Sequence, residues 1–201
     1  MRDKKLGLKV TEEELTQVIP KAWIGGSVSR DTAYEIAYAL REYIEKRVSK
    51  GRGLGNEPFS PNVYSKGYQN SADFKAYGKK PRPVNMRLTG DMMRSIDIGV
   101  SSDGLPMLSI NDENAPKAHG HQTGQYGEGP LPVRPFFGVT KDEFEKVARR
   151  FRSLIEQETA EKNQEVQRSF SDDTARLPSP KDALKVLGEL QSLKKLVKLI
   201  K

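Results

Sequence analysis

Residues 30–50 contain the pattern that most restricts how this chain can fold. Six apolar residues recur there at helical spacing, and Gly51 follows them as a stop signal. The spacing predicts an amphipathic helix that buries one face, with Tyr34, Tyr38 and Tyr43 at the edge of the core. The six residues are Ala33, Ile36, Ala37, Leu40, Ile44 and Val48.

A second, shorter helix is predicted near the N-terminus. Thr11 is followed three residues later by Glu14, which is the spacing of a capping box. Pro20 and the glycine pair at 25–26 would end this helix.

The middle of the chain predicts a β-hairpin followed by a long helix. Apolar residues alternate on both sides of an Asp-Gly turn over 96–110, which favours two antiparallel strands. Thr140 and Glu143 form a capping box ahead of a helix expected over 141–168. The apolar stripe of that helix is Phe144, Val147, Ala148, Phe151, Leu154 and Ile155.

The segment 51–83 lacks any sustained period. It combines glycines, prolines and lysines with scattered aromatic residues. So long an irregular segment in a compact domain is usually functional or disordered, and aromatic residues favour order because they can be buried. We therefore expect an extended basic arm that packs against neighbouring subunits or partners. Its aromatic residues are Phe59, Tyr64, Tyr68, Phe74 and Tyr77.

The end of the chain has a separate organisation. Residues 171–180 have the composition of a linker. Residues 181–201 carry leucines on one side and lysines on the rest, which predicts an amphipathic helix. We expect it to dock on protein, and an anionic membrane surface is the alternative partner. The expected division is therefore an α+β domain over 1–170, a linker and a C-terminal helix.

Charge and composition limit the partners of the chain. It has 34 Lys and Arg against 27 Asp and Glu, a net charge of +7, and the excess is uneven. Eight Lys and Arg stand against three acids over 51–94, and six Lys against two acids over 181–201. Such a region attracts polyanions, so nucleic-acid binding through 51–94 is an alternative function. The lack of cysteine excludes disulfides, Cys-ligated zinc and thiol catalysis. We expect neither a signal peptide nor membrane contact, because no stretch approaches the ~20 apolar residues of a membrane span.

His119 and His121 are the only histidines and the obvious candidates for a metal or catalytic site. On a strand they would share a face, but zinc requires at least a third ligand. The surrounding glycines and prolines favour a loop, and the chain has neither a nucleophile elbow nor a phosphate-binding loop. We therefore predict no enzyme activity, cofactor or metal, and keep a metal-dependent hydrolase at these histidines as a further alternative.

Three stretches together resemble a known family. They read RLTGDMMRSI over 87–96, AHGHQTGQ over 118–125 and LPVRPFFGVTKDEFEKV over 131–147. In this order they are similar to elements of the virion morphogenesis proteins of tailed bacteriophages, the tail-completion or neck proteins. The corresponding residues are Leu88, Thr89, Gly90, Ser95 and Ile96, then Ala118, His121, Gln122 and Gly124, then Pro132, Arg134, Pro135, Phe136, Phe137 and Gly138.

The resemblance implies a structural virion protein. Such a protein forms a closed ring of its own copies in the neck, where the portal vertex of the head meets the tail. Its partners would be portal, adaptor and tail proteins, with the DNA in the lumen as a further contact. It would be made in the host cytoplasm and located at the head–tail interface of the virion.

The residues of the third stretch suit a passage between a sheet and a helix. Pro132 and Pro135 hold the chain extended and withhold backbone donors. Arg134 can reach a carboxylate or backbone carbonyls with its forked set of donors. Phe136 and Phe137 alternate, so we expect one in the core and the other against a neighbour.

The predicted fold class is therefore α+β. A small, mainly antiparallel sheet would be packed by two long helices, with an extended basic arm and a C-terminal amphipathic helix. In this fold His121 and Gln122 would form hydrogen bonds within a loop.

Overall fold

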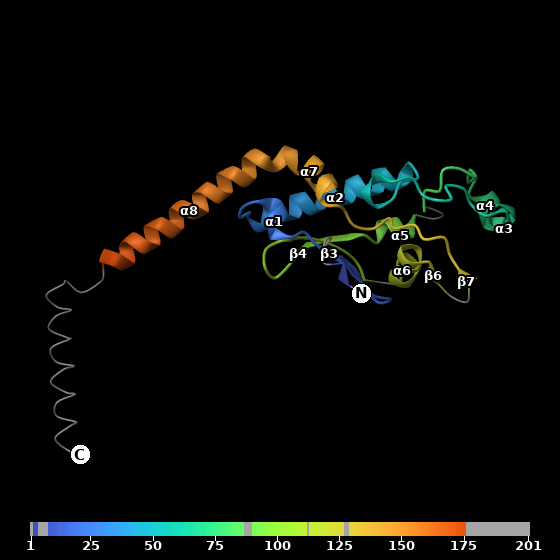
Figure 1. Ribbon diagram of the computed structural model, residues 1–201, viewed down its shortest axis with the longest axis horizontal. Helices are drawn as coiled ribbons and strands as arrows, with labels where there is room; N and C mark the ends of the chain where they lie inside the picture. Colours follow the sequence, from blue (N-terminus) through green and yellow to red (C-terminus); the bar gives the residue numbers. More distant parts are fainter. Residues whose placement is uncertain (1, 4–7, 87–89, 112, 127–128, 176–201) are drawn as a thin grey trace, which may run out of the picture. The chain divides into compact units, whose positions relative to one another are not determined.

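The computed structural model describes residues 2–3, 8–86, 90–111, 113–126 and 129–175 (Figure 1). The chain divides into two compact units, residues 1–159 and 160–201. The fold is α+β, as predicted, with two long helices packed on a small antiparallel sheet. The predicted C-terminal helix over 181–201 lies outside the described residues.

The sheet has the strand order β1-β2-β3-β5-β4, and all its neighbours are antiparallel. The predicted hairpin over 96–110 is confirmed as β4 and β5, with Ile98 opposite Leu108 and Gly104 at φ 76° in the turn. The strands are β1 Arg2–Asp3, β2 Leu8–Val10, β3 Leu15–Val18, β4 Asp97–Val100 and β5 Pro106–Ile110.

The short helix predicted from Thr11 and Glu14 is wrong. These two residues form the turn between β2 and β3, where the amide of Thr11 donates to the carbonyl of Glu14 at 2.9 Å. The Thr11 hydroxyl accepts from the amide of Glu14 at 3.0 Å, which is the contact that an N-cap makes at a helix start. The same local hydrogen bond therefore occurs in a turn and at a helix start. Here the residues that follow form strand β3, so the contact belongs to a turn.

Helix α2, Arg30–Ser49, lies along one side of the sheet against β4 and β5 (Figure 1). Ser29 caps it by accepting from the amide of Thr32 at 3.1 Å. All six residues of the predicted stripe are completely buried, which confirms the amphipathic helix. Tyr34 and Tyr38 are not at the core edge as expected, because they are 49% and 47% exposed.

The long helix predicted over 141–168 is divided in the structure. Helix α7, Lys141–Ala148, begins at the predicted capping box, and a 3-10 turn, Arg149–Phe151, joins it to α8, Arg152–Ala175. Ile155 is buried, but Leu154 is 39% exposed and does not belong to the apolar stripe. Helix α8 extends five residues into the predicted linker, and residues 176–180 lie outside the described part of the chain.

The segment 51–83 is ordered and contains short helices. Phe59 and Phe74 are buried, while Tyr64 and Tyr68 pack with Phe74 at ring-centroid distances of 5.3 to 5.6 Å. The aromatic residues thus stabilise the segment, as expected. Its elements are the 3-10 turn Leu54–Asn56, α3 Lys66–Asn70 and α4 Ala72–Ala76.

A buried ion pair joins α2 to the start of α7. Nη1 of Arg47 lies 2.6 Å from Oε1 of Glu143, and both side chains are at most 2% exposed. Nη2 of Arg47 donates to the carbonyls of Phe136 and Gly138, the latter at 3.0 Å. Oε2 of Glu143 accepts from the amides of Thr140 at 2.9 Å and Gly55 at 3.1 Å. Both Nη atoms of Arg47 and both carboxylate oxygens of Glu143 therefore have partners, although Nε of Arg47 is buried without one. Such pairing is what a buried ion pair requires to be tolerated.

Replacing Arg47 with methionine should lower the free energy of unfolding by about 3–5 kcal/mol, because Glu143 would stay buried without its cation. Urea denaturation of the purified protein measures this loss. The control is Arg41→Met on the same helix, which removes a pair with Glu45 whose side chains are 30% and 31% exposed, and it should cost at most about 1 kcal/mol. Equal, small losses in both variants would contradict the role given to the buried pair.

Candidate functional site

The residues of the third motif stretch form a buried passage into α7, here called the strap, residues 134–140. The strap has no strand partner, although most of it is buried. Buried backbone amides and carbonyls need partners, so other groups must supply them.

Two glutamine side chains provide much of what a neighbouring strand would. Oε1 of Gln122 accepts from the amides of Phe136 at 2.7 Å and Phe137 at 3.2 Å. Gln17, in the buried strand β3, exchanges two hydrogen bonds of 2.8 Å with the amide and carbonyl of Val139. The side-chain amide groups of Gln17 and Gln122 therefore provide hydrogen bonds that the edge of a neighbouring strand would otherwise provide.

Other backbone groups of the strap are also paired. The amide of Arg134 donates to the carbonyl of His121, and the carbonyl of Pro135 accepts from the amide of Leu54, both at 2.7 Å. Nη2 of Arg47 donates hydrogen bonds to the carbonyls of Phe136 and Gly138. The strap is thus fixed by four different parts of the chain, namely β3, α2, the segment around Leu54 and the helix that carries His121 and Gln122.

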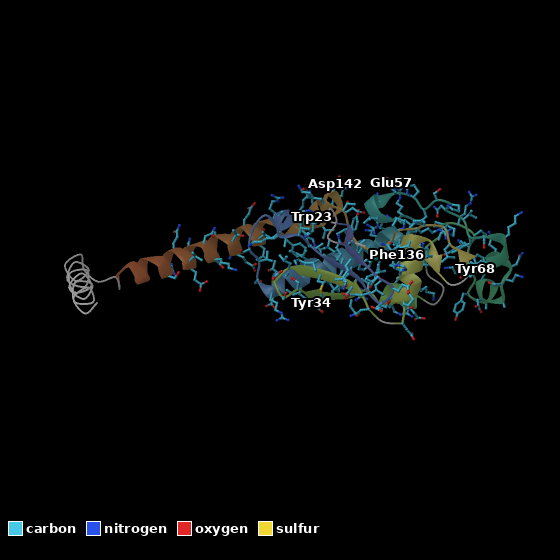
Figure 2. All side chains as sticks on the ribbon, turned by 60° about the horizontal axis from the view of Figure 1, so that its bottom comes forward. Trp23, Tyr34, Glu57, Tyr68, Phe136 and Asp142 are labelled. Carbon is cyan, nitrogen blue, oxygen red and sulfur yellow. The ribbon has the colours of Figure 1, made fainter. Side chains whose placement is uncertain are left out.

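Phe136 and Phe137 are both completely buried, so the expectation that one faces a neighbour is wrong. Figure 2 shows Phe136 inside the folded body. The strap is covered on both sides, and alternation along it does not separate a core face from a solvent face.

The histidine motif lies on a helix, not on the predicted strand or loop. Helix α6, Ala115–Thr123, has proline in its first turn and ends at Gly124, whose φ of 80° is left-handed. A side chain at Gly124 would also approach the carbonyl oxygen of Leu131 to 2.9 Å. Because each helical residue turns by about 100°, His119 and His121 point about 200° apart and do not share a face.

A cavity of about 430 Å³ lies beside the strap, here called the α6 cavity. Helix α6 contributes Lys117 and His121, and the chain entering the strap contributes Leu131, Pro132 and Arg134. Tyr64 and Tyr68 come from the 51–83 segment, and Gly90, Asp91 and Met92 come from the start of α5, Asp91–Arg94.

Arg134 and His121 have polar atoms in this region without a protein partner. Arg134 is 7% exposed, and its Nη2 donates to the carbonyls of Pro61 at 3.1 Å and Val63 at 3.5 Å. Nε of Arg134 and Nδ1 of His121 are buried and unpaired. Burial, assisted by the positive charges of Arg134 and Lys117, lowers the pKa of His121 to about 4.

The other motif residues have local structural roles. Gly90 precedes α5 with φ 96°, and Ser95 follows it, with its hydroxyl donating to the carbonyl of Met92 at 3.0 Å. Leu88 and Thr89 lie outside the described residues. Arg134 reaches backbone carbonyls, one of the two kinds of partner predicted for it.

The sequence reasoning missed Gln17 and Arg47. Position 47 falls on the buried stripe of α2, three residues after Ile44, so a charged residue there was a detectable signal of a buried partner. Gln17 had no local signal, because its partner Val139 lies 122 residues away.

Two further properties concern ions and membranes. Among the described residues, no three side chains of the types His, Asp and Glu are grouped so that they could hold a metal ion. None of the helices in this part of the chain is long and apolar enough to span a membrane.

Comparisons with known proteins give no relative. No family model, curated protein or solved structure matches the chain.

Gln122→Ala should lower the free energy of unfolding by about 2–4 kcal/mol, because two buried amides of the strap would lose their acceptor. Urea denaturation measures it, and Gln125→Ala, at an exposed position just after α6, is the matched control. If the two variants were equally stable, Gln122 would not hold the strap.

The stability of the chain should fall as the pH decreases from 6.5 to about 4, because the folded state lowers the pKa of His121 from 6.5 to about 4. In that window the unfolded chain binds the proton more tightly, so protonation favours unfolding, by at most about 3 kcal/mol. Unfolding at a series of pH values tests this. His121→Asn should flatten the profile, and an unchanged slope in that variant would contradict the expectation.

Proposed function

We propose that this chain is a structural virion protein of a tailed bacteriophage. It forms a ring in the neck and joins the portal vertex of the head to the tail. It acts by contact with copies of itself and with portal, adaptor and tail proteins, at the head–tail interface.

The observation that carries this proposal is that residues from all three motif stretches lie close together in the fold. Gly90, His121 and Arg134 belong to different stretches, yet all line the α6 cavity. Gln122 of the second stretch also holds Phe136 and Phe137 of the third. A chance likeness would give no reason for separate stretches to form one contiguous unit, so their convergence supports the family resemblance.

The use of the motif side chains supports a structural role. Gln122 and Arg134 direct hydrogen bonds at the backbone of the same chain, and the two phenylalanines are core residues. The two imidazoles, on different sides of α6, are poorly placed to share one ion or substrate. This arrangement favours the proposed function over a metal-dependent hydrolase.

The surface of the first unit offers contacts for assembly. Tyr34 and Tyr38 are half-exposed one helical turn apart on α2, and Figure 2 shows Tyr34 at the edge of the body. Exposed tyrosines are enriched at protein interfaces. In a ring this face would meet a different face of the next copy, because head-to-tail contacts close only through a fixed rotation.

Nucleic-acid binding through 51–94 remains the second candidate. Lys66, Lys75 and Lys80 are exposed, which favours contact with a polyanion. However, Tyr64 packs with the neighbouring rings and Lys79 lies 5.2 Å above it, so these groups stabilise the segment. Base stacking of the kind that single strands require is therefore less well supported than charge attraction.

Immunogold electron microscopy of the phage particles that contain this protein tests the proposal. Antibodies to the full chain should label the junction between head and tail, and antibodies to the major capsid protein serve as the control for shell labelling. Label on the shell, on the tail tip or on no particle would contradict the proposal. A purified protein that binds DNA tightly, with affinity falling steeply as salt increases, and labels no particle would favour the second candidate.

A further inference from the structure

The α6 cavity has features that neither the fold nor the proposed function uses. Its volume of about 430 Å³ falls in the range of ligand sites in proteins. Val84, Met86, Met92 and Leu131 give it an apolar wall, and Tyr64 and Tyr68 add two aromatic rings. An apolar group of moderate size would therefore find matching surface there.

The polar groups of the cavity are mainly donors or cations. Arg134 is almost fully buried, and two backbone carbonyls occupy its Nη2 while Nε has no partner. Lys117 is exposed on α6 and lines the same cavity. Buried polar groups in folded proteins nearly always have partners, so the unpaired Nε calls for one.

The only acidic residue lining the cavity in the described part of the chain is Asp91. Its carboxylate pairs with Arg94 in its own helix, and both side chains are more than half exposed. The carboxylate of Asp91 thus already has a partner on its own helix.

We propose that the α6 cavity binds a carboxylate carried on an apolar body. The carboxylate pairs with Arg134, whose guanidinium donates directional hydrogen bonds, and with Lys117 at the mouth. The apolar body lies against Met92, Leu131 and the tyrosine rings. Two sources have this chemistry: a free monocarboxylic acid, and the C-terminal carboxylate of a polypeptide with an apolar last residue.

His121 contributes to the selectivity of the site without a charge. Its imidazole is neutral at pH 7, since burial and the nearby cations lower its pKa. Nδ1 is unpaired in the fold and can form a hydrogen bond with the ligand. The proposal does not depend on the location of the protein in a virion.

Titration of the full chain with two matched pairs of probes, followed by NMR, tests the proposal. The pairs are phenylacetate with phenylacetamide, and N-acetyl-phenylalanine with its amide. Each acid should bind at least about tenfold more tightly than its amide, because the amide lacks the charge that pairs with Arg134. The ring signals of His121 should shift while those of His119 serve as an internal control.

The two pairs of probes distinguish the two possible sources of the carboxylate. Binding of both acids indicates that a free monocarboxylate suffices, and binding of N-acetyl-phenylalanine alone indicates a polypeptide C-terminus. Equal binding of acids and amides, or no shift at His121 with any probe up to about 10 mM, would overturn the proposal.

A charge reversal at the mouth provides the second measurement. Lys117→Glu should weaken binding of the acids by about tenfold and leave the amides unaffected. Because Lys117 is exposed, the variant should fold, and its unfolding curve checks this. Lys146→Glu, on the exposed side of α7 and outside the cavity lining, is the matched control and should bind like the parent chain. Equal affinity in the two variants would contradict the assignment of the site.

Discussion

The first unit depends on one buried ion pair, Arg47 with Glu143. Neither charge could remain in the core alone, so the helix that carries Arg47 and the start of α7 are obliged to pack together. The same guanidinium holds the carbonyls of Phe136 and Gly138, and the same carboxylate caps α7. The helix contact, the strap and the cap are therefore parts of one network. Removing one member would leave the other polar groups buried without a partner.

The strap illustrates how irregular backbone can be buried. A β-strand would satisfy its amides and carbonyls with a neighbouring strand, whereas here Gln17, Gln122 and Arg47 supply separate partners. This solution fixes one backbone path through side chains that come from distant parts of the sequence. The chain just before the strap, Leu131 and Pro132, forms part of the wall of the α6 cavity, and Arg134 belongs to both the strap and the wall. The third motif stretch therefore contributes both to the strap and to the cavity.

Much of the fold could be predicted where its cause is local. The stripe of α2, the Asp-Gly hairpin and the Thr140 capping box each depend on residues within one helix, one pair of strands or one turn. The failures have a different origin. Thr11 makes the same local contact in a turn as in a helix cap, and the glycines around His121 did not reveal α6, whose α-helical backbone passes through Gly120. Gln17 and the burial of both strap phenylalanines depend on packing between distant segments, which no local pattern contains.

The central claim is that side chains, in place of a strand, hold the strap, and that the motif residues serve this purpose. Hydrogen–deuterium exchange of the full chain measures it most directly. The amides of Phe136, Phe137 and Val139, all outside strands, should exchange as slowly as those of β3 and β5, because these residues are buried and glutamine side-chain oxygens accept from their amides. Exchange at the rate of an open loop would show that the strap is not held in this way.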